Sequence, residues 1–160
     1  MENGVKVENL EEVQQMLAEL AERLEDLRPA LLEAAQVIQN STEEAFESGV
    51  SPWGKTWTPL ASSTLDAKGA SALNPLSTGK MLYESGRLRE SLYISVGMDA
   101  RSVEVGVNAH AKGYPYPAVH QFGTRDAKVP ARPFLPMDSS GELERGVSEE
   151  ILEAFQEYLK

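Results

Sequence analysis

Two histidines, His110 and His120, are the first residues whose side chains could carry metal or acid–base chemistry. A metal site usually needs a close cluster of ligands, such as two histidines four residues apart on a helix. No Asp, Glu or Cys lies between these two histidines. The spacing therefore predicts no metal centre, and we expect His120 to be a packed or hydrogen-bonded residue within a strand. A metal-dependent hydrolase or nuclease that uses His120 with Asp126 or Glu104 remains the remote enzyme alternative.

Nucleophile and phosphate-binding motifs are also missing from the sequence. Residues 77–80 read Ser-Thr-Gly-Lys but lack the upstream glycine spacing of a phosphate-binding loop, and no G-x-S-x-G motif occurs. Glu43 and Glu44 lie next to each other in a predicted helix, where neighbouring side chains diverge by about 100°. Two such carboxylates cannot act together on one bond. The sequence therefore predicts no enzyme and no cofactor.

Length and composition are those of an ordinary globular chain. The 160 residues are 41% hydrophobic and 25% charged, which allows one domain with a substantial core. The absence of cysteine excludes disulfides and thiolate metal sites. Apolar runs are only a few residues long and the first residues are acidic, so we expect no membrane span, no secretory signal and a cytosol-like compartment.

Charge is unevenly distributed along the chain. Residues 1–50 contain 12 acidic and 3 basic residues, residues 51–132 contain 6 acidic and 10 basic residues, and residues 133–160 contain 7 acidic and 2 basic residues. This pattern lacks the concentrated basic face that nucleic-acid binding requires, so sequence-specific binding of nucleic acid is not expected. The acidic ends are either solvated helix faces or surfaces that meet the basic middle of a neighbouring subunit.

Helices are predicted first, in an arm formed by residues 1–49. Between residues 8 and 27, apolar residues recur at steps of three and four, the spacing of a heptad stripe. Pro29 interrupts this pattern, and a second helix is expected from residue 29 to about residue 48, with Gly49 as its stop. The two helices form either a hairpin or one kinked rod. The stripe consists of Leu10, Val13, Leu17, Leu20, Leu24 and Leu27.

The rest of the chain, residues 50–160, is predicted to be an α+β unit that folds together with the arm. A packed loop over residues 50–79 and a short helix over residues 80–89 are followed by strands at 91–97 and 101–107, each with alternating apolar residues. A third strand is expected at 118–122 and an edge strand at 132–137. An amphipathic helix over residues 142–159 is expected to pack across this sheet of about four strands, which would form the core.

Four short motifs are rich in residues that fix backbone shape and packing. The first contains Trp57, Pro59 and Leu60, and the second contains Gly86, Leu88 and Ser91. The third contains His120, Gln121 and Gly123, and the fourth is the unbroken run Pro-Ala-Arg-Pro-Phe-Leu at 130–135. We expect the first motif to pin the long loop to the body of the domain.

These motifs, in this order and spacing, resemble the phage virion morphogenesis family, the tail-completion proteins of Mu-like and P2-like phages. The resemblance covers about residues 40–159. It implies a structural virion protein that forms a ring, a hexamer, in the neck or at the head-proximal end of the tail, where heads join tails. The implied partners are copies of itself and other neck and tail proteins, and DNA would pass through the lumen. A tail terminator or a connector-stopper ring is the alternative position.

The expected ring also suggests which residues form the interfaces between its subunits. A ring subunit needs two unlike faces, one for each neighbour. In the arm, Leu17 and Leu24 are candidates, because three heptads are too short to be stable alone and must dock on something. In the fourth motif, Arg132, Phe134 and Leu135 are candidates on an exposed extended edge. The alternative is that Phe134 and Leu135 enter the core while Arg132 stays on the surface.

Overall fold

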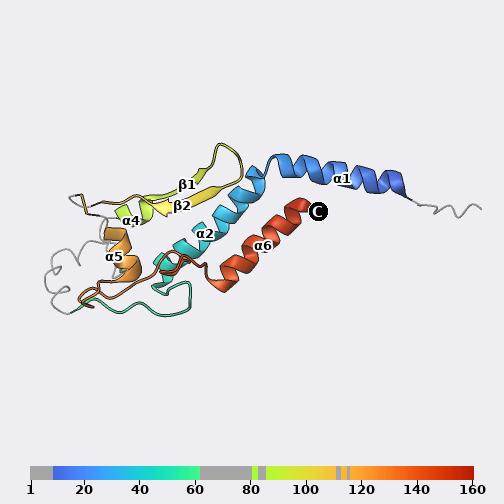
Figure 1. The fold of residues 1–160 in the computed structure, drawn as a ribbon. Helices are drawn as coiled ribbons and strands as arrows, with labels where there is room; N and C mark the ends of the chain where they lie inside the picture. The colour runs from blue at the N-terminus through green and yellow to red at the C-terminus, as the bar shows by residue number, and fades with distance from the viewer. Residues whose placement is uncertain (1–8, 62–80, 83–85, 111–112, 115) are drawn as a thin grey trace, which may run out of the picture.

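The computed structural model describes residues 9–61, 81–82, 86–110, 113–114 and 116–160. A long central helix lies between a β-hairpin on one side and the C-terminal helix on the other, and the first helix projects beyond this body (Figure 1). The elements are α1 (Leu10–Glu25), α2 (Arg28–Ser48), α4 (Arg87–Glu90), β1 (Leu92–Val96), β2 (Val103–Val107), α5 (Tyr116–Phe122) and α6 (Arg145–Leu159). The mixed helix-and-strand class expected from the sequence is confirmed.

Helix α2 is the central element because small residues line its buried sides. Ala30, Ala34 and Ala35 are buried, which lets α6 and the hairpin approach the helix axis closely. The helix ends at Gly49, whose φ of 67° is the left-handed conformation that glycine adopts without strain. Helix α2, predicted as part of the arm, therefore lies in the body of the fold, between α6 and the hairpin (Figure 1).

The core lies at the C-terminal end of α2, not in the sheet. Its buried residues come from α2, the loop after it, α4, the segment after β2 and the fourth motif: Ala45, Phe46, Trp57, Leu88, Ala109 and Phe134. No residue of β1 or β2 is fully buried. The expectation that the sheet forms the core is therefore wrong, because a two-stranded hairpin covers only part of one side of α2.

The sheet is smaller than predicted. In the described part of the chain it contains β1 and β2 alone, paired antiparallel with Ile94 opposite Val105. Residues 118–122, expected to be a strand, lie in helix α5, where Pro117 occupies the first turn, a position that suits proline. A short apolar run fits either structure by pattern alone.

The predicted edge strand at 132–137 is also absent. Within the described part of the chain this segment pairs with no strand, and its one bridge is the isolated pair of Met137 with Leu143. Pro133 and Pro136 have no N–H group to donate to a ladder. The segment instead hydrogen-bonds to a side chain of α5, as described below.

Helix α1 does not fold back along α2 as a hairpin would (Figure 1). The two helices are broken at Asp26, which is extended, and at Leu27. Helix α6 packs against α2 and also touches α1, and the Tyr158 hydroxyl donates to the Asp26 carbonyl oxygen at 2.6 Å. The C-terminal helix therefore packs on α2 and not, as predicted, across the sheet. None of the described helices combines the length and the apolar character needed to cross a membrane.

Candidate functional site

The first and fourth motifs meet in the core. Trp57 is 2% exposed, and its indole Nε1 donates to the Pro133 carbonyl oxygen at 2.9 Å. The Phe46 ring stacks on Phe134, with ring centroids 5.1 Å apart, and meets Trp57 edge-on at 6.1 Å. Aromatic pairs in these geometries stabilise a core beyond the area they bury. Trp57 thus attaches the start of the long loop to the body, while residues 62–79 of that loop lie outside the described residues.

Arg132 is the charged member of this junction. It is 4% exposed, and its Nε and Nη2 donate to the carbonyl oxygens of Thr58 and Pro59 at 2.9 and 3.2 Å. Burial lowers the pKa of the guanidinium from its ordinary value. The two carbonyl oxygens offset part of the cost of taking this charge out of water. Arg132 therefore ties the first motif to the fourth.

Gln121 of α5 replaces the missing strand partner of the fourth motif. Its side-chain Nε2 donates to the carbonyl oxygens of Leu135 and Met137, both at 2.9 Å. Its Oε1 accepts from the backbone N–H groups of Phe134 and Leu135, both at 3.0 Å. All four bonds come from one amide that is 3% exposed, so a single side chain satisfies the backbone of a segment that no strand pairs.

Gly123 lets the turn after α5 approach the fourth motif. Its φ is 75°, and a Cβ atom placed there would lie 2.9 Å from the Ala131 backbone nitrogen. Both the conformation and the space therefore require glycine. His120 lies three residues before Gly123, and its ring packs edge-on against the Tyr116 ring with centroids 5.9 Å apart. The His120 carbonyl oxygen accepts a hydrogen bond from the backbone N–H of Arg132 at 2.6 Å. His120 is thus packed as expected, but in a helix and not in a strand.

The second motif forms a tight helical turn before β1. Gly86 caps α4 with a φ of 73°, and Leu88 is buried in the core. The Ser91 hydroxyl donates to the Leu88 carbonyl oxygen at 2.8 Å. This turn holds the start of the hairpin against the core.

The exposed edge expected for the fourth motif is wrong. Phe134 is fully buried, Arg132 is buried by its carbonyl contacts, and Leu135 is half-buried against the core. The alternative expectation placed Phe134 in the core and Arg132 on the surface. It is right for Phe134 and wrong for Arg132. Pro59 is exposed and Leu60 half-buried, so of the first motif only Trp57 is a core residue.

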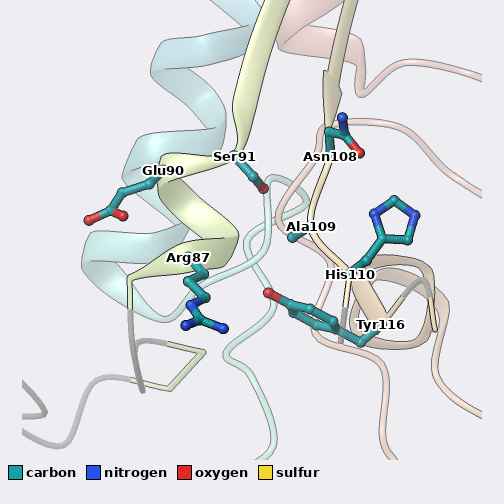
Figure 2. Close-up of a pocket in the computed structure, with 7 residues that line it drawn as sticks. All are labelled: Arg87, Glu90, Ser91, Asn108, Ala109, His110 and Tyr116. Carbon is teal, nitrogen blue, oxygen red and sulfur yellow. The ribbon is translucent and has the colours of Figure 1, made fainter. Parts of the chain in front are cut away.

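An open pocket of about 280 Å³ lies beside the second motif. Figure 2 shows the Tyr116 ring below Ala109 and His110 with its hydroxyl end toward Arg87 of α4, while the Glu90 carboxylate points away from the other side chains. Within the described part of the chain, no group of three or more His, Asp or Glu side chains could hold a metal ion. The pocket is lined by Arg87, Glu90, Ser91, Asn108, Ala109, His110 and Tyr116.

The arm candidates Leu17 and Leu24 lie among the exposed apolar side chains of helix α1. Helix α1 has no buried residue. Leu17 is 60% and Leu24 46% exposed, whereas Leu20 and Leu27 of the same stripe are half-buried. One side of the stripe is therefore partly covered by the chain itself, and the other side faces solvent.

Comparison with known proteins agrees with the motif pattern. The model of the phage virion morphogenesis family matches residues 8–160. The chain belongs to this family. The putative capsid assembly protein G of Escherichia phage Mu is 33% identical over 119 residues, with 69% of each chain covered. No solved structure matches the chain significantly.

Membership of the phage virion morphogenesis family gives the chain a structural or assembly role in phage morphogenesis. In this family member, the motif residues Trp57, Gln121 and Gly123 build the junction between α5, the loop after α2 and the fourth motif. Sequence reasoning identified these positions but missed the four hydrogen bonds of Gln121 and the burial of Arg132. The hydrogen bonds of Gln121 could have been suspected from the prolines of the fourth motif, which cannot donate to a strand partner and follow this glutamine in the sequence.

Proposed function

We propose that this protein is a ring-forming tail-completion protein, placed in the neck at the head-proximal end of the tail, where it enables heads to join tails. The ring has six copies, assembles in the host cytoplasm and remains in the virion. DNA passes through its lumen without sequence-specific contacts. The family supports the assembly role, and the finer position comes from the motif resemblance.

The observation that carries the proposal is the uncovered apolar side of α1. The rest of the described chain closes its own core around Phe46, Trp57 and Phe134, yet Leu17 and Leu24 remain about half exposed or more. A helix of 16 residues is marginal in water unless its apolar face packs against something. The exposed stripe therefore needs a second surface, which a neighbouring subunit supplies.

The acidic charge of α1 favours a neighbouring surface that is basic. The polar faces of α1 carry acidic side chains that would repel one another in a parallel pair of α1 helices: Glu11, Glu12, Glu19, Glu22 and Glu25. A basic surface avoids this repulsion, and the basic residues lie in the middle of the chain. Among them, Arg89 is paired with Glu43 and Glu47, whereas four exposed residues make no ion pair within the described part: Lys55, Arg87, Arg101 and Arg125.

The proposal is tested in a lysate of the phage that lacks only this protein. Electron microscopy should show heads and tails that are complete but unjoined, and adding the purified protein should restore joined particles. Antibody labelling of wild-type virions should mark the neck. A defect confined to head formation, or label at the tail tip, would contradict the proposed position. Tails of irregular length would instead favour the tail terminator, and heads that lose DNA would favour the connector-stopper ring.

A further inference from the structure

The β-hairpin leaves both of its outer edges without a strand partner in the described part of the chain. The bonds Asn108 N–H to Ser91 O and Gly97 N–H to Ser102 O flank the ladder. Because antiparallel pairs alternate, Tyr93–Gly106 and Ser95–Glu104 are the hydrogen-bonded pairs between them. The backbone groups of Leu92, Ile94 and Val96 then point out of one edge, and those of Val103, Val105 and Val107 point out of the other.

Both edges lack several of the features that usually prevent further pairing. The strand sequences Leu-Tyr-Ile-Ser-Val and Val-Glu-Val-Gly-Val contain no proline and no lysine, and the ladder pairs residue by residue without a bulge. Ile94, which shares a sheet face with the half-buried Val105, is still 36% exposed. The hairpin thus has two unpaired edges and an apolar face that α2 covers only in part.

We propose that β2 of one copy pairs with β1 of the next copy, so that the hairpins of an assembled ring form one continuous antiparallel sheet. This inference rests on the proposed ring. A second copy of the chain fits these edges because one edge is β1 and the other is β2, which run in opposite directions. When a rotation about the ring axis places the next hairpin beside β2, the strand next to β2 is the β1 of that copy, and the two strands are antiparallel. Head-to-tail contacts of this kind close into rings, and closure removes both edges.

Side-chain pattern restricts how the two copies align. If Ile94 of one copy lies opposite Val105 of the other, or is shifted from that position by an even number of residues, it stays on the same sheet face as Val103 and Val105. A shift by an odd number of residues would place apolar side chains on the polar face. The opposite face then carries Tyr93, whose ring lies over Gly106 and whose hydroxyl hydrogen-bonds to Glu104. Together, the copies would present a polar, acidic sheet face and an apolar face partly covered by the α2 helices.

Cysteine cross-linking tests this pairing directly, because the chain has no cysteine of its own. Ser95→Cys and Glu104→Cys are made in separate chains, since both residues are exposed and mid-strand. The two chains are co-expressed and treated with a bismaleimide that spans roughly 8 Å, the distance between diagonal neighbours on adjacent strands. A Glu153→Cys chain, with its cysteine exposed on α6, replaces each partner in turn as the matched control. Melting curves check that every variant folds like the wild type.

We expect a covalent dimer in the Ser95→Cys and Glu104→Cys mixture, and none when either chain is alone or paired with Glu153→Cys. Links within Ser95→Cys alone would overturn the head-to-tail pairing, because they require two β1 edges to meet. An oligomer by light scattering without any link would overturn the edge pairing and leave the proposed ring intact. A monomer without any link would contradict both proposals.

Discussion

Trp57 and Pro133, 76 positions apart in the chain, are joined by a hydrogen bond of 2.9 Å from the indole Nε1 to the carbonyl oxygen. The bond fastens the first residues of the long loop to the segment that leads into α6. Because the indole is also packed against Phe46, one side chain contributes both apolar burial and a specific hydrogen bond.

Removal of the Trp57 side chain should strongly destabilise the fold. Trp57→Ala should lower the free energy of unfolding by about 3–5 kcal/mol, the usual cost of deleting a large buried aromatic. Trp57→Phe keeps most of the packing but leaves the Pro133 oxygen without its donor, so its cost should be about 1–3 kcal/mol. Denaturant unfolding of both variants measures the difference. A Trp57→Phe protein as stable as the wild type would show that the hydrogen bond to Pro133 contributes nothing.

Gln121 should be more sensitive to substitution than its polar character suggests. Gln121→Leu has a similar volume but can neither donate to Leu135 and Met137 nor accept from Phe134. We expect a loss of at least about 2 kcal/mol, because each buried group left unsatisfied costs roughly 1–3 kcal/mol. Gln36→Leu on the exposed face of α2 is the matched control and should change stability little. A Gln121→Leu protein that melts like the wild type would contradict this role.

Gly123 and Gly54 form a matched pair for substitution by alanine. Both have a φ of 75°, but a Cβ at Gly123 would meet the Ala131 backbone at 2.9 Å, whereas nothing lies within 4 Å at Gly54. Gly54→Ala should cost about 1 kcal/mol for the left-handed conformation alone. Gly123→Ala should cost clearly more, since backbone must also move. Thermal unfolding of the two variants compares them, and equal shifts would remove the packing argument.

Asp138 should make stability depend on pH in the acidic range. The hydroxyl of Ser140, followed by the backbone N–H of Glu142, holds the pKa of this carboxyl below its ordinary value. A lowered pKa in the folded state stabilises the protein above the ordinary value, and this contribution is lost as pH falls through the folded-state pKa. Asp138→Asn keeps the acceptor oxygen and should lose this dependence. NMR titration of the carboxyl measures the pKa, and an ordinary value would contradict the prediction.

Much of this arrangement could be predicted from sequence, because some patterns have one physical solution. The heptad stripe and Pro29 gave two helices with a break near the correct place, and the valine alternation gave the hairpin. The third strand failed because Tyr116–Phe122 is short and apolar, and neither length nor periodicity separates strand from helix there. The burial of Arg132 could not be predicted, since its acceptors, the carbonyl oxygens of Thr58 and Pro59, come from a loop more than 70 positions earlier.

Salt should weaken assembly if acidic α1 helices meet a basic surface of the neighbour. Between about 0.1 M and 1 M salt the Debye length falls from roughly 10 to 3 Å, which screens exposed charges. Light scattering at increasing salt should show a falling oligomer fraction, while the melting temperature of the chain changes little. Assembly that strengthens with salt would indicate that apolar contact alone holds the copies together.

The central claim is that the exposed side of the α1 stripe joins subunits in the particle that connects heads to tails. Its most direct test is the fraction of joined virions, counted in micrographs of a lysate in which the only copy of the protein carries Leu17→Asp and Leu24→Asp. Gln15→Asp with Ala18→Asp adds the same charge elsewhere on α1 and serves as the control. We predict separate heads and tails for the first variant and joined virions for the control. Joined virions at the wild-type level from the Leu17→Asp and Leu24→Asp protein would contradict the account.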